Sequence, residues 1–184
     1  MTENINLSSI NKGNVLIIGK RKSGKTTIMN KLCVNKTPIY SSDCHTEDIC
    51  KDLPIINDND NDINGKCTQF DDMNVFVREL VADKKFMDLV DSANKHSLLN
   101  VFILQSLGMV SPTFQQKMDY VIICCGNDFS SFDKNLIYNR YIENTENDIS
   151  FETFSNLFKR NDYILIDKNS KVYSVNYSIA LNFA

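Results

Sequence analysis

The sequence predicts an α/β protein whose central sheet is mostly parallel and flanked by helices. Short apolar segments alternate with stretches of helical spacing along almost the whole chain, which is the pattern of such a sheet. Residues 14–27 read NVLIIGKRKSGKTT, so a buried-strand pattern, a glycine-bounded turn and a helical pattern follow one another directly. These two observations predict a fold built from strand–loop–helix units.

Each element has its own signal in the sequence. Strands are expected where apolar residues run together, over residues 14–18, 37–41, 74–78, 99–104, 119–124 and 162–166. Helices are expected where apolar residues recur three and four apart, over residues 24–34, 84–95, 130–142 and 151–159. Residues 43–72, rich in Asp, Asn and Cys, predict a loop with one short helix, and residues 171–184 a strand or hairpin at the sheet's edge. We expect a flexible N-terminus over residues 1–12 and a single domain over residues 13–184.

The composition predicts a globular chain kept in a reducing cytosol. Of the 184 residues 42% are hydrophobic, yet no apolar run reaches the roughly 18 residues that span a bilayer, and the polar N-terminus has no secretory signal. The six cysteines are scattered, and a zinc site built from Cys44, His45, Cys50 and Cys67 would have the spacing of no common zinc finger. A net charge of −3 argues against a free-standing protein that binds nucleic acid tightly, but not against DNA threaded through a ring.

The most specific motif is a phosphate-binding loop. Gly19, Gly24, Lys25 and Thr26 complete the pattern G-x-x-x-x-G-K-[ST] between a strand and a helix. Glycines let the backbone approach a polyphosphate closely, and the following helix adds its partial positive charge. Lys25 is expected to reach the β- and γ-phosphates and Thr26 to bind Mg²⁺, so the cofactors are ATP and Mg²⁺. The nucleotide-binding residues are predicted to be Gly19, Lys20, Arg21, Lys22, Ser23, Gly24, Lys25, Thr26 and Thr27.

The rest of the chain selects among the enzymes that use this loop. A small GTPase would need D-x-x-G and N-K-x-D, and neither occurs. A nucleoside monophosphate kinase needs several arginines around the transferred phosphate, whereas this chain has four in all, one of them inside the loop. An ATPase with an additional strand remains, because the strand predicted over 99–104 runs into Gln105, whose amide could position water or sense the γ-phosphate.

The acidic motif that such an ATPase needs is ambiguous. The strand predicted over 74–78 ends in Arg78 and Glu79, which makes Glu79 the candidate general base and puts Arg78 where an Asp should support the metal. Like charges near Mg²⁺ would then oppose metal binding. The alternative pair, Asp71 and Asp72, is acidic enough but follows Cys67–Phe70, a poor pattern for a buried strand.

An ordered series of segments resembles the DNA-packaging ATPases of poxviruses and giant viruses, a branch of the FtsK–HerA superfamily of P-loop ATPases. The similarity covers most of residues 13–175. Its segments are the phosphate loop, Asp83-Lys84-Lys85, Lys95-His96, the strand Val101 to Gln105, Pro112 with Phe114, Asp119-Tyr120, Phe151 to Phe154, and Tyr163 to Asp167. Family members carry an Asp at Arg78, and usually an arginine at Gln115 and at Lys95, so this chain would be a divergent member.

The resemblance implies a RecA-like, FtsK–HerA-type P-loop ATPase that serves as a ring-motor subunit packaging viral double-stranded DNA. Lys25, Glu79 and Gln105 would then be its catalytic residues. Its partners would be double-stranded DNA, copies of itself or of related subunits in a ring or mixed oligomer, and viral capsid proteins, at the assembly site in the host cytoplasm or in the virion. Two other readings stay open: a catalytically impaired ATP-binding paralogue acting as a structural or switch subunit, and a small-molecule kinase.

Overall fold

The computed structural model describes residues 7–34, 36–42, 53, 65–71, 73, 77–125, 129–143, 149–160, 162–169 and 171–175. Within them, seven strands form one sheet in the order β2-β3-β4-β1-β5-β6-β7. The first five pair in parallel, whereas β6 and β7 run antiparallel along one edge. The predicted α/β fold with a mostly parallel sheet is confirmed. The strands are β1 (Gly13–Ile18), β2 (Thr37–Ser42), β3 (Lys66–Phe70), β4 (Leu99–Leu104), β5 (Tyr120–Cys124), β6 (Tyr163–Asp167) and β7 (Val172–Val175).

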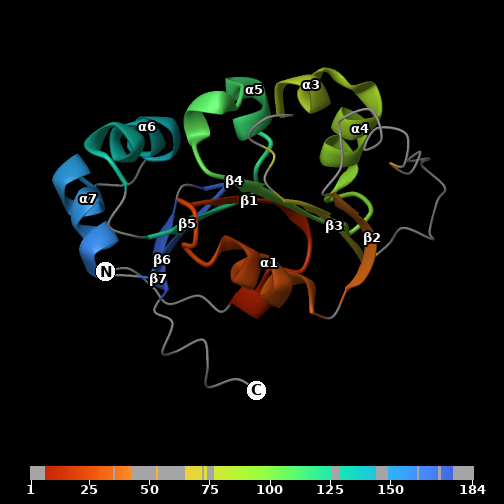
Figure 1. Ribbon diagram of the computed structural model, residues 1–184, viewed down its shortest axis with the longest axis horizontal. Helices are drawn as coiled ribbons and strands as arrows, with labels where there is room; N and C mark the ends of the chain where they lie inside the picture. The colour runs from red at the N-terminus through yellow and green to blue at the C-terminus, as the bar shows by residue number, and fades with distance from the viewer. Residues whose placement is uncertain are drawn as a thin grey trace.

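Helices cover the two faces of the sheet unequally. Helix α1 (Lys25–Cys33) lies on one face, and the other five α-helices within the described residues lie on the opposite face (Figure 1). Strand β1 supplies both cores, because Val15 and Ile17 pack toward α1 while Leu16 and Ile18 pack toward the other helices. The remaining helices are α3 (Val77–Ala82), α4 (Lys84–Ser92), α5 (Pro112–Gln115), α6 (Ser131–Tyr141) and α7 (Phe151–Arg160), with 3-10 turns η1 (Leu7–Ser9) and η3 (Leu107–Met109).

Most predicted elements lie where their signals placed them. Strand β4 has the predicted bounds, and β1, β5, β6, α1, α4, α6 and α7 differ from the expected ranges by no more than a few residues at either end. Strand β7 pairs with β6 at the sheet's edge, as expected for that segment, and residues 176–184 lie outside the described residues. Within the N-terminus expected to be flexible, Leu7–Ser9 form η1, and the side chains of Leu7 and Ile10 are buried.

The strand predicted over residues 74–78 is wrong for Val77 and Arg78. Residues 77–82 form helix α3, and residues 74–76 lie outside the described part of the chain. The apolar run fits the period of a strand, but Val77 and Leu80 are three apart and both are buried, whereas Arg78 and Glu79 between them are exposed. The strand beside β4 is instead β3, which lies inside the segment expected to form a loop.

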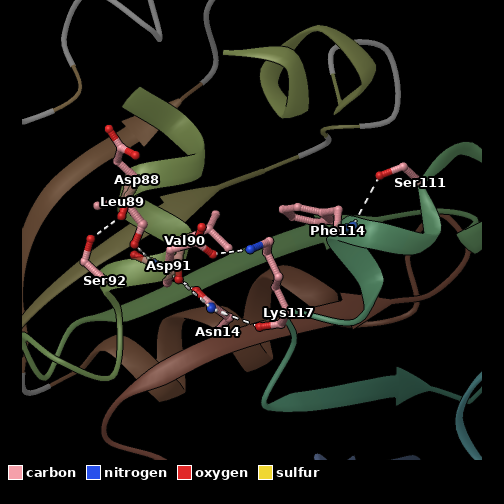
Figure 2. A network of polar contacts seen from close by, with 10 residues as sticks. Asn14, Asp88, Leu89, Val90, Asp91, Ser92, Ser111, Phe114 and Lys117 are labelled. Carbon is pink, nitrogen blue, oxygen red and sulfur yellow. Dashed lines mark hydrogen bonds and ion pairs between the residues drawn. The ribbon is translucent and has the colours of Figure 1, made fainter. Parts of the chain in front are cut away.

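Strand β3 can place the polar Thr68 in the core because Asn100, on the neighbouring strand β4, provides a hydrogen-bond partner for its hydroxyl. The Thr68 hydroxyl donates to Asn100 Oδ1 on β4 at 2.6 Å, and Asn100 Nδ2 donates to Asn14 Oδ1 on β1 at 2.9 Å. Asn14 Nδ2 in turn donates to the carbonyls of Val90 and Lys117, at 2.9 and 3.0 Å (Figure 2). This polar ladder of Thr68, Asn100 and Asn14 crosses three adjacent strands and fixes their register, because each member is buried and needs its partner.

Candidate nucleotide-binding site

The loop between β1 and α1 has the backbone that a phosphate cradle needs. Gly24, immediately before α1, has φ 91° and ψ 11°, and Lys22 has φ 64°. Left-handed residues in a short loop turn successive N–H groups toward one side, which makes an anion-binding concavity. The Ser23 N–H donates to the Lys20 carbonyl at 3.2 Å and closes the loop on itself. The left-handed conformation of Lys22 is costly for a residue with a side chain, and such conformations are concentrated at functional sites.

Gly19 is required where the loop leaves the sheet. A Cβ at this position would lie 2.3 Å from Ser23 Oγ and 2.9 Å from Cys124 Cβ, both closer than side chains pack. Cys124 forms part of the floor on which the loop rests, and burial raises the pKa of its thiol to about 12. The Cys124 thiol is therefore uncharged at neutral pH and does not repel an anion bound by the loop.

Lys25 turns back from the first residue of α1 onto the loop. Its Nζ donates to the Lys20 carbonyl at 2.7 Å, so the ammonium is held against the loop backbone. The ammonium can turn from this carbonyl to a phosphate oxygen, because a charge-assisted hydrogen bond to phosphate replaces the one that is lost.

Asp71 is the acid that faces Thr26, at the helix end of the loop. It follows β3 directly, and its Oδ2 lies 3.4 Å from the Thr26 hydroxyl. A threonine hydroxyl and a carboxylate form a donor set suited to Mg²⁺, which prefers oxygen ligands and keeps much of its water. Among the described residues, no group of three or more His, Cys, Asp or Glu side chains gathers as a metal cluster.

This geometry corrects the interpretation of Arg78 and Glu79. Both lie on exposed positions of α3 rather than directly after a sheet strand, so Arg78 does not occupy the position at a strand's end that the sequence pattern gave it. The pair Asp71-Asp72, which the sequence left as an alternative, is the one that follows the strand next to β4. Asp72 lies outside the described residues.

Gln105 lies where the sequence predicted, directly after β4. The Gly19 N–H donates to the Leu104 carbonyl at 3.1 Å, so the chain passes into Gln105 beside the start of the phosphate loop. Gln115, matched to a family arginine, is only 3% exposed, and its Nε2 donates to the carbonyls of Leu107 and Val110 at 3.3 and 2.8 Å. The Gln115 side chain therefore points into the protein and is hydrogen-bonded to the segment that follows Gln105. Lys95, by contrast, is exposed.

Sequence reasoning missed Asp133, which reaches the loop from α6. Lys20 Nζ lies 3.1 Å from Asp133 Oδ2 and 5.8 Å from the centroid of the Phe129 ring. Burial acts to raise the pKa of Asp133, but hydrogen bonds from Ser130 and Lys20 outweigh it and hold that pKa below its ordinary value. The spacing Ser130-x-x-Asp133 is a capping-box signal for the start of α6, and both of its hydrogen bonds are present. That signal could have placed Asp133 at a helix start, but not beside Lys20.

No family model and no curated protein matches the sequence. Among solved structures, the chain is similar to the genome packaging NTPase B204 of Sulfolobus turreted icosahedral virus 2 in complex with AMP, with a TM-score of 0.63 at 10% identity over 89% of this chain and 96% of that one. The complex of the same protein with AMPPCP gives a TM-score of 0.61 at 12% identity, over 89% and 98% of the two chains. B204 of Sulfolobus turreted icosahedral virus gives 0.58 at 13% identity, over 88% and 97%. At this identity the similarity is one of fold, and the chain has the fold of these P-loop NTPases.

Proposed function

We propose that the protein binds Mg²⁺·ATP in the loop Gly19–Thr27 and hydrolyses it. The observation that carries this proposal is the arrangement of three side chains around one loop. Lys25 lies against the loop backbone, and the Thr26 hydroxyl lies 3.4 Å from Asp71. An ordinary lysine-rich surface turn would not need a buried, sterically obligatory glycine at one end and a carboxylate from a distant strand at the other.

Each residue has a distinct role in the proposed reaction. The loop N–H groups and Lys25 bind the β- and γ-phosphates, and Thr26 and Asp71 hold the metal and its water. The metal, when bound, neutralises charge that develops on the phosphate oxygens. Gln105 positions the attacking water or senses the γ-phosphate. Two acids are candidates for the general base: Glu79, from the sequence pattern, and Asp72, which we favour because its neighbour Asp71 is the acid that faces Thr26.

For the biological role of the whole protein, we propose that it is a subunit of a ring motor that packages double-stranded viral DNA. The support is the sequence resemblance together with a fold like that of the B204 packaging NTPases. A homo-oligomeric ring or a mixed oligomer, capsid proteins as partners, and a place at the viral assembly site or in the virion belong to the same proposal. None of the described helices is long and apolar enough to cross a membrane.

The alternative of a catalytically impaired paralogue loses its first argument. It rested on Arg78 replacing an acid directly after a sheet strand, and Arg78 lies on helix α3 instead. What remains for it is the absence of an arginine at Gln115, a buried position. It is therefore an outcome of the test below rather than a competing proposal.

The test is Mg²⁺-dependent ATP turnover by the purified protein, with and without double-stranded DNA, with Lys25→Ala as the blank. We expect turnover above the blank that rises with DNA. Turnover at the blank level with retained nucleotide binding would instead support the switch or structural subunit. Phosphoryl transfer to a small acceptor, indifferent to DNA, would support the kinase.

A further inference from the structure

Lys20 makes contacts through both its backbone carbonyl and its side-chain ammonium. Its backbone carbonyl accepts the hydrogen bond from Lys25 Nζ at 2.7 Å, and its own ammonium pairs with Asp133 at 3.1 Å. The side chain of Asp133 is 14% exposed and that of Lys20 34%, so water screens the pair less than a surface ion pair. The nearby Phe129 ring gives the ammonium a second favourable neighbour.

Asp133 itself is anchored. Its carboxylate accepts from the Ser130 hydroxyl at 2.8 Å and from the Ser130 N–H at 3.3 Å, at the start of α6. Helix α6 also packs on η3, the turn that follows Gln105, where Leu136 lies close to Gly108. One rigid helix thus contacts both the phosphate loop and the segment after the proposed γ-phosphate sensor.

A negative charge on Asp133 is unexpected beside a phosphate-binding loop. A carboxylate beside a loop that binds polyphosphate repels the ligand unless a cation cancels it. Lys20 supplies that cation, and the ion pair also directs the Lys20 side chain toward α6 rather than leaving it free to follow the phosphates.

We propose that Asp133 is a positioning residue for the phosphate loop: it holds Lys20, and through the Lys20 carbonyl it sets the place of Lys25. Lys20 in turn shields the bound nucleotide from the charge of Asp133. This inference rests on the proposed function, because it assumes that the loop binds a nucleotide. It assigns the Lys20 side chain to α6 and leaves phosphate contact to the loop backbone and Lys25.

A double-mutant cycle tests the proposal. The measured quantity is the Kd of Mg²⁺·AMPPNP for wild type, Lys20→Met, Asp133→Asn and the double variant, each checked for its thermal transition. Lys20→Met leaves an uncompensated carboxylate, and we expect binding to weaken about tenfold. Asp133→Asn keeps an oxygen to cap α6 but loosens Lys20, and should weaken binding about threefold. The double variant should resemble Asp133→Asn, because the repulsion has gone.

The controls separate this role from others. Lys117→Met and Asp91→Asn break an ion pair at the opposite end of the sheet and should leave Kd unchanged (Figure 2). Losses that multiply in the Lys20/Asp133 double variant would overturn the inference, since a Lys20 that touched phosphate directly would give that result. If Lys20→Met unfolds, Lys20→Gln serves in its place. Wild type that binds no nucleotide would overturn the proposed function and this inference together, whereas wild type that binds with multiplying losses overturns the inference alone.

Discussion

At the scale of single residues, the loop imposes steric demands that a substitution can expose. Gly19→Ala would place a methyl group 2.3 Å from Ser23 Oγ and 2.9 Å from Cys124 Cβ. We expect a loss of about 1–3 kcal/mol in the free energy of unfolding, together with weakened nucleotide binding, because the loop must shift. Denaturant titration and ligand titration measure the two effects.

A matched glycine provides the control. Gly108→Ala would meet its nearest atoms at 3.7 and 3.8 Å, which is ordinary contact, and no left-handed φ is required there. That variant should unfold and bind nucleotide like wild type. Equal tolerance of alanine at both glycines would contradict the close packing of the loop on Cys124.

The reassigned acid gives a second prediction at this scale. Asp71→Asn should lower Mg²⁺-dependent turnover at least about tenfold, because the carboxylate beside Thr26 helps to hold the metal. Glu79→Gln, on the exposed face of α3, should leave turnover within about twofold of wild type, if Asp72 is the base. Initial rates over a range of Mg²⁺ concentrations check both. A large loss in Glu79→Gln alone would restore the role that the sequence pattern suggested for Glu79.

At the scale of elements, the sequence predicted the bounds of a strand or helix well where a single pattern, such as an apolar run, was strong. The apolar run 14–18 and the glycine-bounded loop predicted β1, the phosphate loop and α1 almost to the residue. Strand β3 could not be predicted, because Thr68 and Gln69 look unlike a buried strand until Asn100 is known to pair with Thr68. The wrong prediction for Val77 and Arg78 has the same cause: the acidic motif requires a strand before it, and the apolar run before Arg78 fits a strand pattern better than Cys67–Phe70 does.

The polar ladder makes this explanation testable. Asn100→Ala would leave the Thr68 hydroxyl, Asn14 Oδ1 and the Leu89 carbonyl without the partner that Asn100 supplies. We expect a loss of about 1–3 kcal/mol in the free energy of unfolding. Nucleotide affinity should change little, because the ladder lies toward the amino ends of the strands, away from the loop.

Asn135→Ala is the matched control, since Asn135 is exposed on α6. Its unfolding free energy should stay within about 0.5 kcal/mol of wild type. If Asn100→Ala also left the free energy of unfolding unchanged, the polar ladder would not be what keeps β3 in the sheet.

At the scale of the whole molecule, the fold class followed from the alternation of elements, and the candidate site only partly. Motif spacing placed Gly19, Gly24, Lys25 and Thr26, because the loop is local in sequence. Asp71 and Asp133 reach the same loop from β3 and α6, and only the tertiary arrangement brings them there. The sequence alone therefore could not predict the places of Asp71 and Asp133 beside the loop.

The proposed ring gives a prediction of its own. Mg²⁺·AMPPNP should shift the protein toward a larger species if, as in ring motors of the family that the sequence resembles, the nucleotide lies between subunits. Double-stranded DNA should favour that species further. Light scattering after size-exclusion chromatography measures the mass, with Lys25→Ala as the variant expected to stay small. A monomer under every condition would contradict the homo-oligomeric form of the proposal while leaving nucleotide binding intact.

The most direct test of the central claim is calorimetric titration of wild type and Lys25→Ala with Mg²⁺·AMPPNP. The claim is that the loop Gly19–Thr27, with Lys25 and the Thr26–Asp71 pair, is a nucleotide site. It predicts one site per chain in wild type and at least about tenfold weaker binding in Lys25→Ala, because a charge-assisted contact to phosphate is lost. No binding in wild type, or equal binding by both proteins, would contradict it.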